Sequence, residues 1–95
     1  MEKKVISDVM FSILTDAISA VTILSVRTEK NLEGSTAIYI TTDDLSTVDK
    51  SKLVDMVEKN SDEHFVVEVL IPETKFIEGK HVENTDSVSI FIEEI

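Results

Sequence analysis

Two histidines and two adjacent aspartates are the residues of this chain whose types and spacing best suit acid–base or metal chemistry. Glu78 and His81 have the Glu-x-x-His spacing of carboxylate-bridged metal sites, and Asp62-Glu63-His64 places three metal-ligating residue types side by side. A carboxylate-bridged site needs such a pair on one helix face and a second pair opposite it. Gly79 interrupts this pair, and the sequence has no second one. We therefore expect both histidines to be loop or strand-end residues.

Asp43 and Asp44 lie in the segment TTDDLST, between a predicted strand and a predicted helix. Paired aspartates at such a position can hold Mg²⁺, usually together with the phosphates of a substrate. The chain offers no cluster of lysines or arginines for those phosphates, so we expect the pair to serve the turn and the start of the helix. A small enzyme that holds a metal ion with Asp43, Asp44 and a histidine is the last of three functional hypotheses.

Other catalytic patterns are missing from the sequence. It has no cysteine, which excludes a disulfide, a thiolate metal site and a thiol nucleophile. Its two glycines are too few for a phosphate-cradling loop, and no serine stands in the nucleophile-elbow pattern. Histidine, arginine, tyrosine and tryptophan, which perform much of the proton transfer and anion binding in enzymes, are nearly absent. The sequence predicts a protein that is not an enzyme and has no cofactor or metal site.

The charge is large and unevenly divided along the chain. Nineteen acidic and nine basic residues give a net charge of −10, whereas a small soluble domain usually carries about 2 to 8. Residues 1–30 hold four of each sign and are neutral, so residues 31–95, with fifteen acids and five bases, carry the whole excess. Such a surface repels phosphate backbones and anionic lipid and attracts basic proteins. We expect neither direct nucleic-acid binding nor membrane binding.

The spacing of these acids predicts mimicry of nucleic acid. Carboxylates two apart on a strand are separated by about 7 Å and those four apart on a helix by about 6 Å, both similar to the spacing of phosphates along a strand. Rows of them can occupy the basic groove of a DNA-binding protein, with an affinity that falls as salt rises. The residues expected to form this partner-binding surface are Asp43, Asp44, Asp49, Asp55, Glu58, Asp62, Glu63, Glu73, Glu78, Glu83, Asp86, Glu93 and Glu94.

The opening run, residues 5–26, could be read as a membrane span or an export signal, but its pattern favours an amphipathic helix. Asp8 and Asp16 interrupt it, and Asp8, Ser12, Thr15, Ser19 and Thr22 recur at helical steps as one polar stripe. We expect a helix over about residues 4–19 of a cytoplasmic protein. Its apolar face is too broad for one small sheet to cover, which predicts a homodimer. The expected interface residues are Met10, Phe11, Leu14 and Ile18.

The remaining pattern predicts an α+β fold in a single domain over residues 1–95. Alternating β-branched segments at 22–29 and 35–42 flank a turn at 30–34, and alternating strands are expected at 63–72 and 87–95. A second helix is expected over 46–60, with Ser46 and Asp49 as its capping box, and a short strand near 76–77 followed by a turn at 78–79. The order α-β-β-α-β-(β)-β indicates two layers, a mainly antiparallel sheet of four or five strands with two helices.

Three functional hypotheses follow, in this order. The first is a homodimeric acidic inhibitor that engages a basic nucleic-acid-binding protein. In charge character the chain resembles the small acidic inhibitors of DNA-binding proteins, many of which are carried by bacterial viruses. The second is a structural or assembly subunit of a viral or other multiprotein complex, in which the acids only keep the protein soluble. The metal-dependent enzyme is the third.

Overall fold

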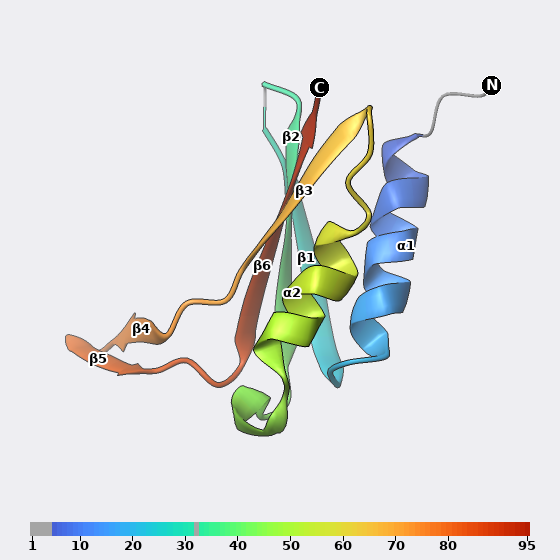
Figure 1. Ribbon diagram of the computed structural model, residues 1–95. Helices are drawn as coiled ribbons and strands as arrows, with labels where there is room; N and C mark the ends of the chain where they lie inside the picture. Colours follow the sequence, from blue (N-terminus) through green and yellow to red (C-terminus); the bar gives the residue numbers. More distant parts are fainter. Residues whose placement is uncertain (1–4, 32) are drawn as a thin grey trace.

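Two helices cover one face of a four-stranded antiparallel sheet, and a separate two-stranded hairpin projects from one end of it (Figure 1). The structure is a computed structural model that describes residues 5–31 and 33–95. The predicted α+β class, order of elements and mainly antiparallel sheet are confirmed. The elements are α1 (Ile6–Ile18), β1 (Ile23–Lys30), β2 (Ser35–Thr42), a 3₁₀ turn (Leu45–Thr47), α2 (Lys50–Glu58), β3 (Phe65–Leu70), β4 (Thr74–Ile77), β5 (Lys80–Glu83) and β6 (Ser87–Glu94).

The strand order β1-β2-β6-β3 places the two most regularly alternating strands, β2 and β6, in the centre of the sheet. Every second residue of these strands is buried, except Glu94 at the end of β6, because side chains alternate between the two faces and only one face is covered. β1 and β3 are the two edges. α2 packs against β3 and α1 packs beside α2, so α1 lies toward the β1 side of the covered face.

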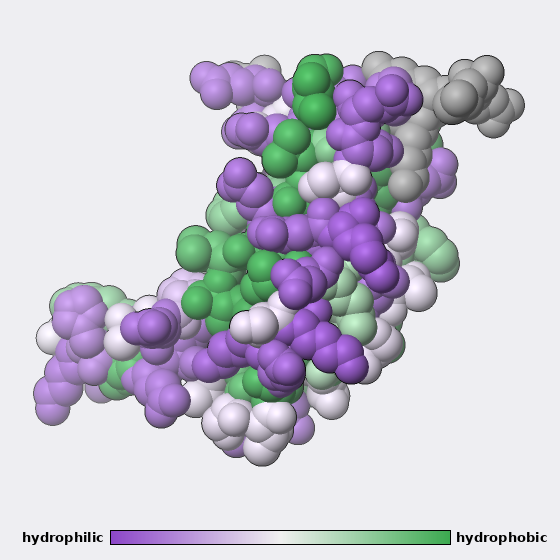
Figure 2. Space-filling model, in the orientation of Figure 1, coloured by the Kyte–Doolittle hydropathy of each residue, from purple (hydrophilic) through white to green (hydrophobic). Residues whose placement is uncertain are grey.

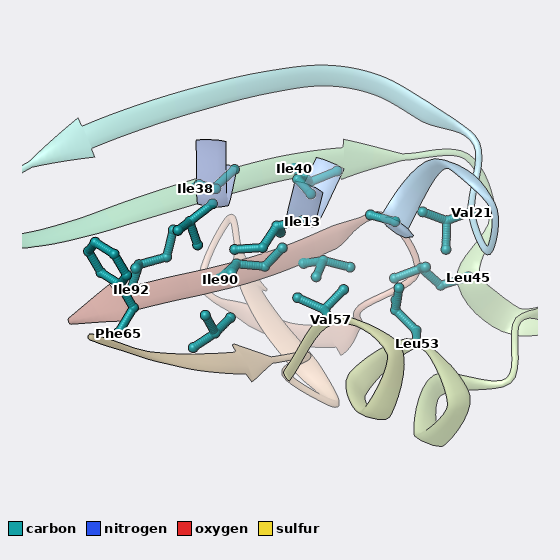
Figure 3. Close-up of a cluster of buried hydrophobic side chains, with 14 residues drawn as sticks. Ile13, Val21, Ile38, Ile40, Leu45, Leu53, Val57, Phe65, Ile90 and Ile92 are labelled. Atoms are coloured by element: carbon teal, nitrogen blue, oxygen red, sulfur yellow. The ribbon is translucent and has the colours of Figure 1, made fainter. Parts of the chain in front are cut away.

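The core lies between this face of the sheet and the helices (Figure 3). α1 buries residues four apart along the helix, as its predicted amphipathic pattern requires, and α2 does the same over a shorter face. Each fully buried aliphatic or aromatic side chain contributes about 1.5–3 kcal/mol relative to exposure. The core side chains labelled in Figure 3 are Ile13, Val21, Ile38, Ile40, Leu45, Leu53, Val57, Phe65, Ile90 and Ile92.

The segment predicted as one helix over 46–60 is two pieces, and the predicted capping box is wrong. The 3₁₀ turn ends before α2 begins, and Asp49, not Ser46, is the N-cap of α2. The Asp49 carboxylate accepts from the backbone N–H of Lys52 at 3.1 Å, which satisfies one of the free donors at the helix start. α2 ends at Glu58, and the side-chain amide of Asn60 beyond it donates to the carbonyl of Val57.

The hairpin β4–β5 has two strands where the sequence predicted one short strand. Its turn lies at Glu78-Gly79 as predicted, and both residues have positive φ (50° and 80°), the conformation of a tight two-residue hairpin turn. Asn84 holds the base of the hairpin, because its buried amide donates to the carbonyls of Pro72 and Ser87 and accepts from the Ser87 N–H. The hairpin therefore projects from a fixed base.

α1 ends at Ile18, one residue before the predicted end, and keeps a polar side; residue 4, where the predicted helix starts, lies outside the described residues. Ser12 donates to the side chain of Asn60 at 2.7 Å, and that side chain donates to Asp16 at 3.0 Å. These bonds tie the polar side of α1 to the C-terminal end of α2. In the described part of the chain, no helix has the length and apolar character needed to cross a lipid bilayer.

Candidate functional site

A groove of about 630 Å³ lies where the C-terminal end of α1 and the N-terminal end of α2 meet. Its walls are the connection from α1 to β1 and the connection from β2 to α2, two segments far apart in the sequence. Three of the acids predicted to bind a partner line it, together with apolar side chains from both helices. The lining residues are Ile18, Ser19, Ala20, Val21, Thr22, Asp43, Asp44, Thr47, Val48, Asp49, Lys52 and Met56.

Asp43 and Asp44 are fixed in the groove by backbone hydrogen bonds. The Asp43 N–H donates to the carbonyl of Thr22 at 3.0 Å, which joins the two connections that form the walls. The Asp43 carboxylate accepts from the Asp44 N–H, and the Asp44 carboxylate accepts from the Ser46 N–H, both at 2.9 Å. The two aspartates thus serve the turn and the start of the next helical segment, as the sequence predicted.

The groove stays negatively charged at neutral pH. The backbone N–H and then the hydroxyl of Ser46 donate to the Asp44 carboxylate and lower the pKa of that group. Asp49 adds a third carboxylate as the cap of α2, and Lys52 is the one basic residue in the lining. Each of the three carboxylates accepts from a backbone N–H, and a carboxylate has further lone pairs that can accept from a ligand.

The apolar part of the groove comes from Ile18, which the sequence predicted for a dimer interface, and from Val48 and Met56, which it assigned to no site. Ile18 is 65% exposed at the end of α1, and Val48 and Met56 are half-buried. The Ser19 hydroxyl donates to the Met56 sulfur at 3.3 Å, so the thioether lies against the end of α1. Methionine adapts its shape to different ligands, and with acids around it the groove suits a ligand that is both apolar and cationic.

The histidines do not join the groove. The Nε2 atom of His64 lies 3.6 Å from the Glu63 carboxylate in the loop before β3, and His81 packs edge-on against Phe76 on the hairpin. In the chain apart from the five residues left undescribed, no group of three or more histidine, aspartate or glutamate residues is arranged to hold a metal ion. Glu78 and His81, the pair with metal-site spacing, belong to the hairpin turn and β5 and do not share a helix.

Two of the predicted partner-binding acids cover the free edge of β3. The Glu58 carboxylate accepts from the Val69 N–H at 3.0 Å, and the Asp62 carboxylate accepts from the Phe65 N–H at the same distance. Between them, the Ser61 hydroxyl both accepts from the N–H of Val67 and donates to its carbonyl. These side chains satisfy the backbone groups that β3 points away from the sheet.

The other predicted acids are spread over separate parts of the molecule. Glu93 and Glu94 lie at the end of β6 that pairs with Ser35, and Asp43 follows the opposite end of β2, about 23 Å away along that eight-residue strand. Asp55 is exposed on α2, and Asp86 is paired with Lys75 at the base of the hairpin. The hairpin and its connections carry Glu73, Glu78 and Glu83.

This distribution does not form one continuous row of carboxylates. On the face shown in Figure 2, hydrophilic residues cover both the body and the hairpin and are interrupted by hydrophobic ones. The place where the structure brings several of the acids together around a hollow is the groove. It contains no aromatic residue and no histidine, so its chemistry is that of ionic and apolar contact.

The predicted dimer residues differ in exposure, and one of them, Ile18, also lines the groove. Phe11 is 74% exposed, Ile18 is also exposed, and Met10 and Leu14 are half-buried at the margin of the core.

Comparisons of the chain with protein-family models, with curated proteins and with solved structures found no match. We therefore infer what the protein binds from the chemistry of the groove, the hairpin and the exposed residues of α1.

Proposed function

We propose that the protein is a non-enzymatic interaction module that holds a basic, partly apolar segment of another protein in the groove between α1 and α2. The observation that carries the proposal is the combination found there, three fixed carboxylates around the exposed Ile18 and the half-buried Met56. A lysine or arginine side chain matches it, because its stem packs on apolar surface while its charged end reaches carboxylates.

The net charge of −10 favours the same class of partner. A strongly negative protein attracts basic proteins at a distance and raises their association rate, while the local contacts decide where they dock. A nucleic-acid-binding protein is the partner that fits best, since its binding surface is rich in lysine and arginine. Occupation of that surface by this acidic module would inhibit nucleic-acid binding, which is the first hypothesis drawn from the sequence.

The non-enzymatic part of the proposal is supported by where the proton-transferring side chains lie. His64 is next to β3 and His81 is on the hairpin, whereas the groove has only carboxylates and Lys52 as titrating groups. General acid–base catalysis needs a group whose pKa is close to the working pH. The Asp44 pKa is shifted downward, away from that range.

The test uses variants that remove charge but keep the fold. Asparagine at positions 44 and 49 still offers a side-chain oxygen to the same backbone N–H groups and is an equally good N-cap, so Asp44→Asn with Asp49→Asn removes two charges only. The matched control removes two charges outside the groove, as Asp55→Asn with Glu73→Gln. The probes are a labelled lysine- and leucine-containing peptide and a basic DNA-binding domain, titrated at low and high salt.

We expect both probes to bind at low salt and to be released at high salt, with amide NMR shifts concentrated around the groove. The groove variant should bind about tenfold more weakly, and the control variant should bind like the parent protein. Equal weakening in both variants would mean that total charge alone attracts the probes, and the groove would lose its role. Competition by DNA for the bound domain tests the inhibitor form of the proposal.

The hairpin supports a second candidate function, a subunit of a larger assembly. Phe76 is 65% exposed, and Ile77 and Val82 are exposed as well, although the hairpin is fixed at its base by Asn84. An isolated two-stranded hairpin has little stability by itself, so an apolar one held away from the body suits insertion into another protein. A photoreactive side chain in place of Phe76 should crosslink to a polypeptide in the native source if this function is correct, and to none if it is not.

A further inference from the structure

β1 is an edge strand whose outer backbone groups have no partner in the part of the chain that the structure describes. Asn31 donates to the carbonyl of Ser35 at 3.0 Å, which identifies these two residues as a hydrogen-bonded pair. Bonded pairs alternate along an antiparallel ladder, so Arg27 and Glu29 bond to β2. Val26 and Thr28 therefore direct their N–H and C=O groups away from the sheet.

Exposed apolar side chains border this open edge. Leu24 is 63% exposed and Val26 is 42% exposed, although Val26 lies on the same face of the sheet as the core residue Ile40. α1 lies toward the β1 side of the covered face and adds Phe11, which is 74% exposed. An open strand edge beside exposed apolar side chains is a surface on which another chain can pair and pack.

The distribution of charge indicates which partner covers the open edge of β1. Two copies of a chain with a net charge of −10 repel each other, and the repulsion is least where both present a neutral surface. Residues 1–30, which contain α1 and β1, are neutral, whereas all the excess negative charge lies in residues 31–95. A second copy can therefore approach through α1 and β1 without bringing acidic surfaces together.

We propose that β1 pairs antiparallel with β1 of a second copy. This pairing joins two four-stranded sheets into one sheet of eight strands and brings the exposed apolar side chains of the two α1 helices together. In a two-fold pairing, residues equally far before and after the centre face each other. If the two-fold axis passes at Thr28, the outward N–H and C=O groups of Val26, Thr28 and Lys30 form hydrogen bonds with those of the partner strand. This position of the axis also places Arg27 opposite the partner's Glu29 in both halves, where centres at Arg27 or Glu29 would place like charges together.

This inference does not depend on the groove, since neither β1 nor Phe11 lines it. The experiment is sedimentation from low to high micromolar concentration, with Thr28→Pro, Arg27→Glu, and Arg27→Glu combined with Glu29→Arg. Proline is tolerated in an edge strand where the N–H points outward, so the first variant keeps the bonds between β1 and β2. Circular dichroism checks that each variant is folded.

We expect the parent protein to dimerise and Thr28→Pro to be monomeric over the same range. Arg27→Glu should weaken dimerisation about tenfold, and the charge-swapped double variant should restore it, because opposite charges again face each other across the two-fold axis. A monomeric parent protein at high micromolar concentration would overturn the proposal. A folded Thr28→Pro variant that dimerises like the parent would overturn it as well, because the edge would then not be the contact.

Discussion

The two edges of the sheet differ in how their outward backbone groups are treated. Along β3, Asp62, Ser61 and Glu58 take up the N–H groups of three alternate residues in turn. Along β1, no described side chain does this for Val26 or Thr28. Both are edge strands of one sheet, so they differ in the protection of their backbone groups and not in their place in the sheet.

The protection of β3 depends on the chain that precedes it. α2 packs against β3 and ends at Glu58, so the residues that follow run back along the strand and present Ser61 and Asp62 to it. The chain that precedes β1 ends α1 and enters the strand through a bulge between Ile23 and Ser25, and it does not run along the open side. We therefore expect substitutions in and around β3 to change the free energy of unfolding, and substitutions in β1 to change association between two copies.

The largest expected effect is at the buried side of β3. Phe65→Ala leaves a cavity in the core and should lower the free energy of unfolding by about 3–5 kcal/mol. Urea denaturation followed by circular dichroism measures this change. Val66→Ala, on the exposed face of the same strand, is the control and should cost about 1 kcal/mol or less; equal losses would mean that β3 does not pack as described.

A smaller effect is expected from opening the protected edge. Ser61→Ala removes the hydroxyl that bonds both backbone groups of Val67 and should cost about 1–2 kcal/mol of unfolding free energy. Glu58→Gln keeps an oxygen that can accept from the Val69 N–H and should cost less than Glu58→Ala. If Ser61→Ala unfolds at the same urea concentration as the parent, the edge needs no protection and the comparison fails.

At the open edge, loss of apolar surface should leave the monomer nearly unchanged. Val26→Thr keeps a β-branched side chain and should change monomer stability by about 0.5 kcal/mol or less, because the residue is already largely exposed. The same variant should dimerise more weakly than the parent in sedimentation. A large loss of stability at concentrations where the protein is monomeric would instead place Val26 in the core.

The smallest effect is that of pH on the ion pair at the base of the hairpin. The hydrogen bond from Lys75, opposed by some desolvation, lowers the pKa of Asp86 in the folded state. A lowered folded-state pKa stabilises the protein above the unfolded pKa of about 3.9, and this contribution is lost as the pH falls through the lower folded value. Both side chains are partly exposed, so solvent screens the pair.

The melting temperatures of the parent and Asp86→Asn measure this contribution. The two should differ slightly at pH 7, with the parent more stable, and should converge in strongly acidic solution. A difference that grows as the pH falls would have the opposite sign and would contradict the pairing of Asp86 with Lys75.

The sequence predicts the fold class because the alternation of apolar and polar residues along a strand follows from the burial of one face of the sheet. Ile38, Ile40, Ile90 and Ile92 recur at every second position and occupy the core as that pattern predicts. The second hairpin strand, KHVE, was missed because it is exposed on both faces and carries no alternating apolar signal. The start of α2 was misplaced because Ser46 and Asp49 both suit a cap, and only the local backbone decides between them.

The candidate sites were harder to predict because they depend on which segments become neighbours. Asp43, Asp44 and Asp49 are visible as acids, but Met56 and Ile18 join them only through the packing of α1 beside α2. The exposed side of α1 was predicted from the width of its apolar face, whereas the open edge of β1 beside it follows from the strand order. No local pattern encodes that order.

Amide hydrogen exchange along the two edges tests the comparison most directly. Exchange at Val67 and Val69 should be slow at every protein concentration, because the Ser61 hydroxyl and the Glu58 carboxylate hold these N–H groups within the monomer. Exchange at Val26 and Thr28 should be fast in dilute solution and slow at high concentration, when the two copies of β1 pair. Fast exchange at Val26 and Thr28 at all concentrations would contradict the account, because β1 would then remain an open edge.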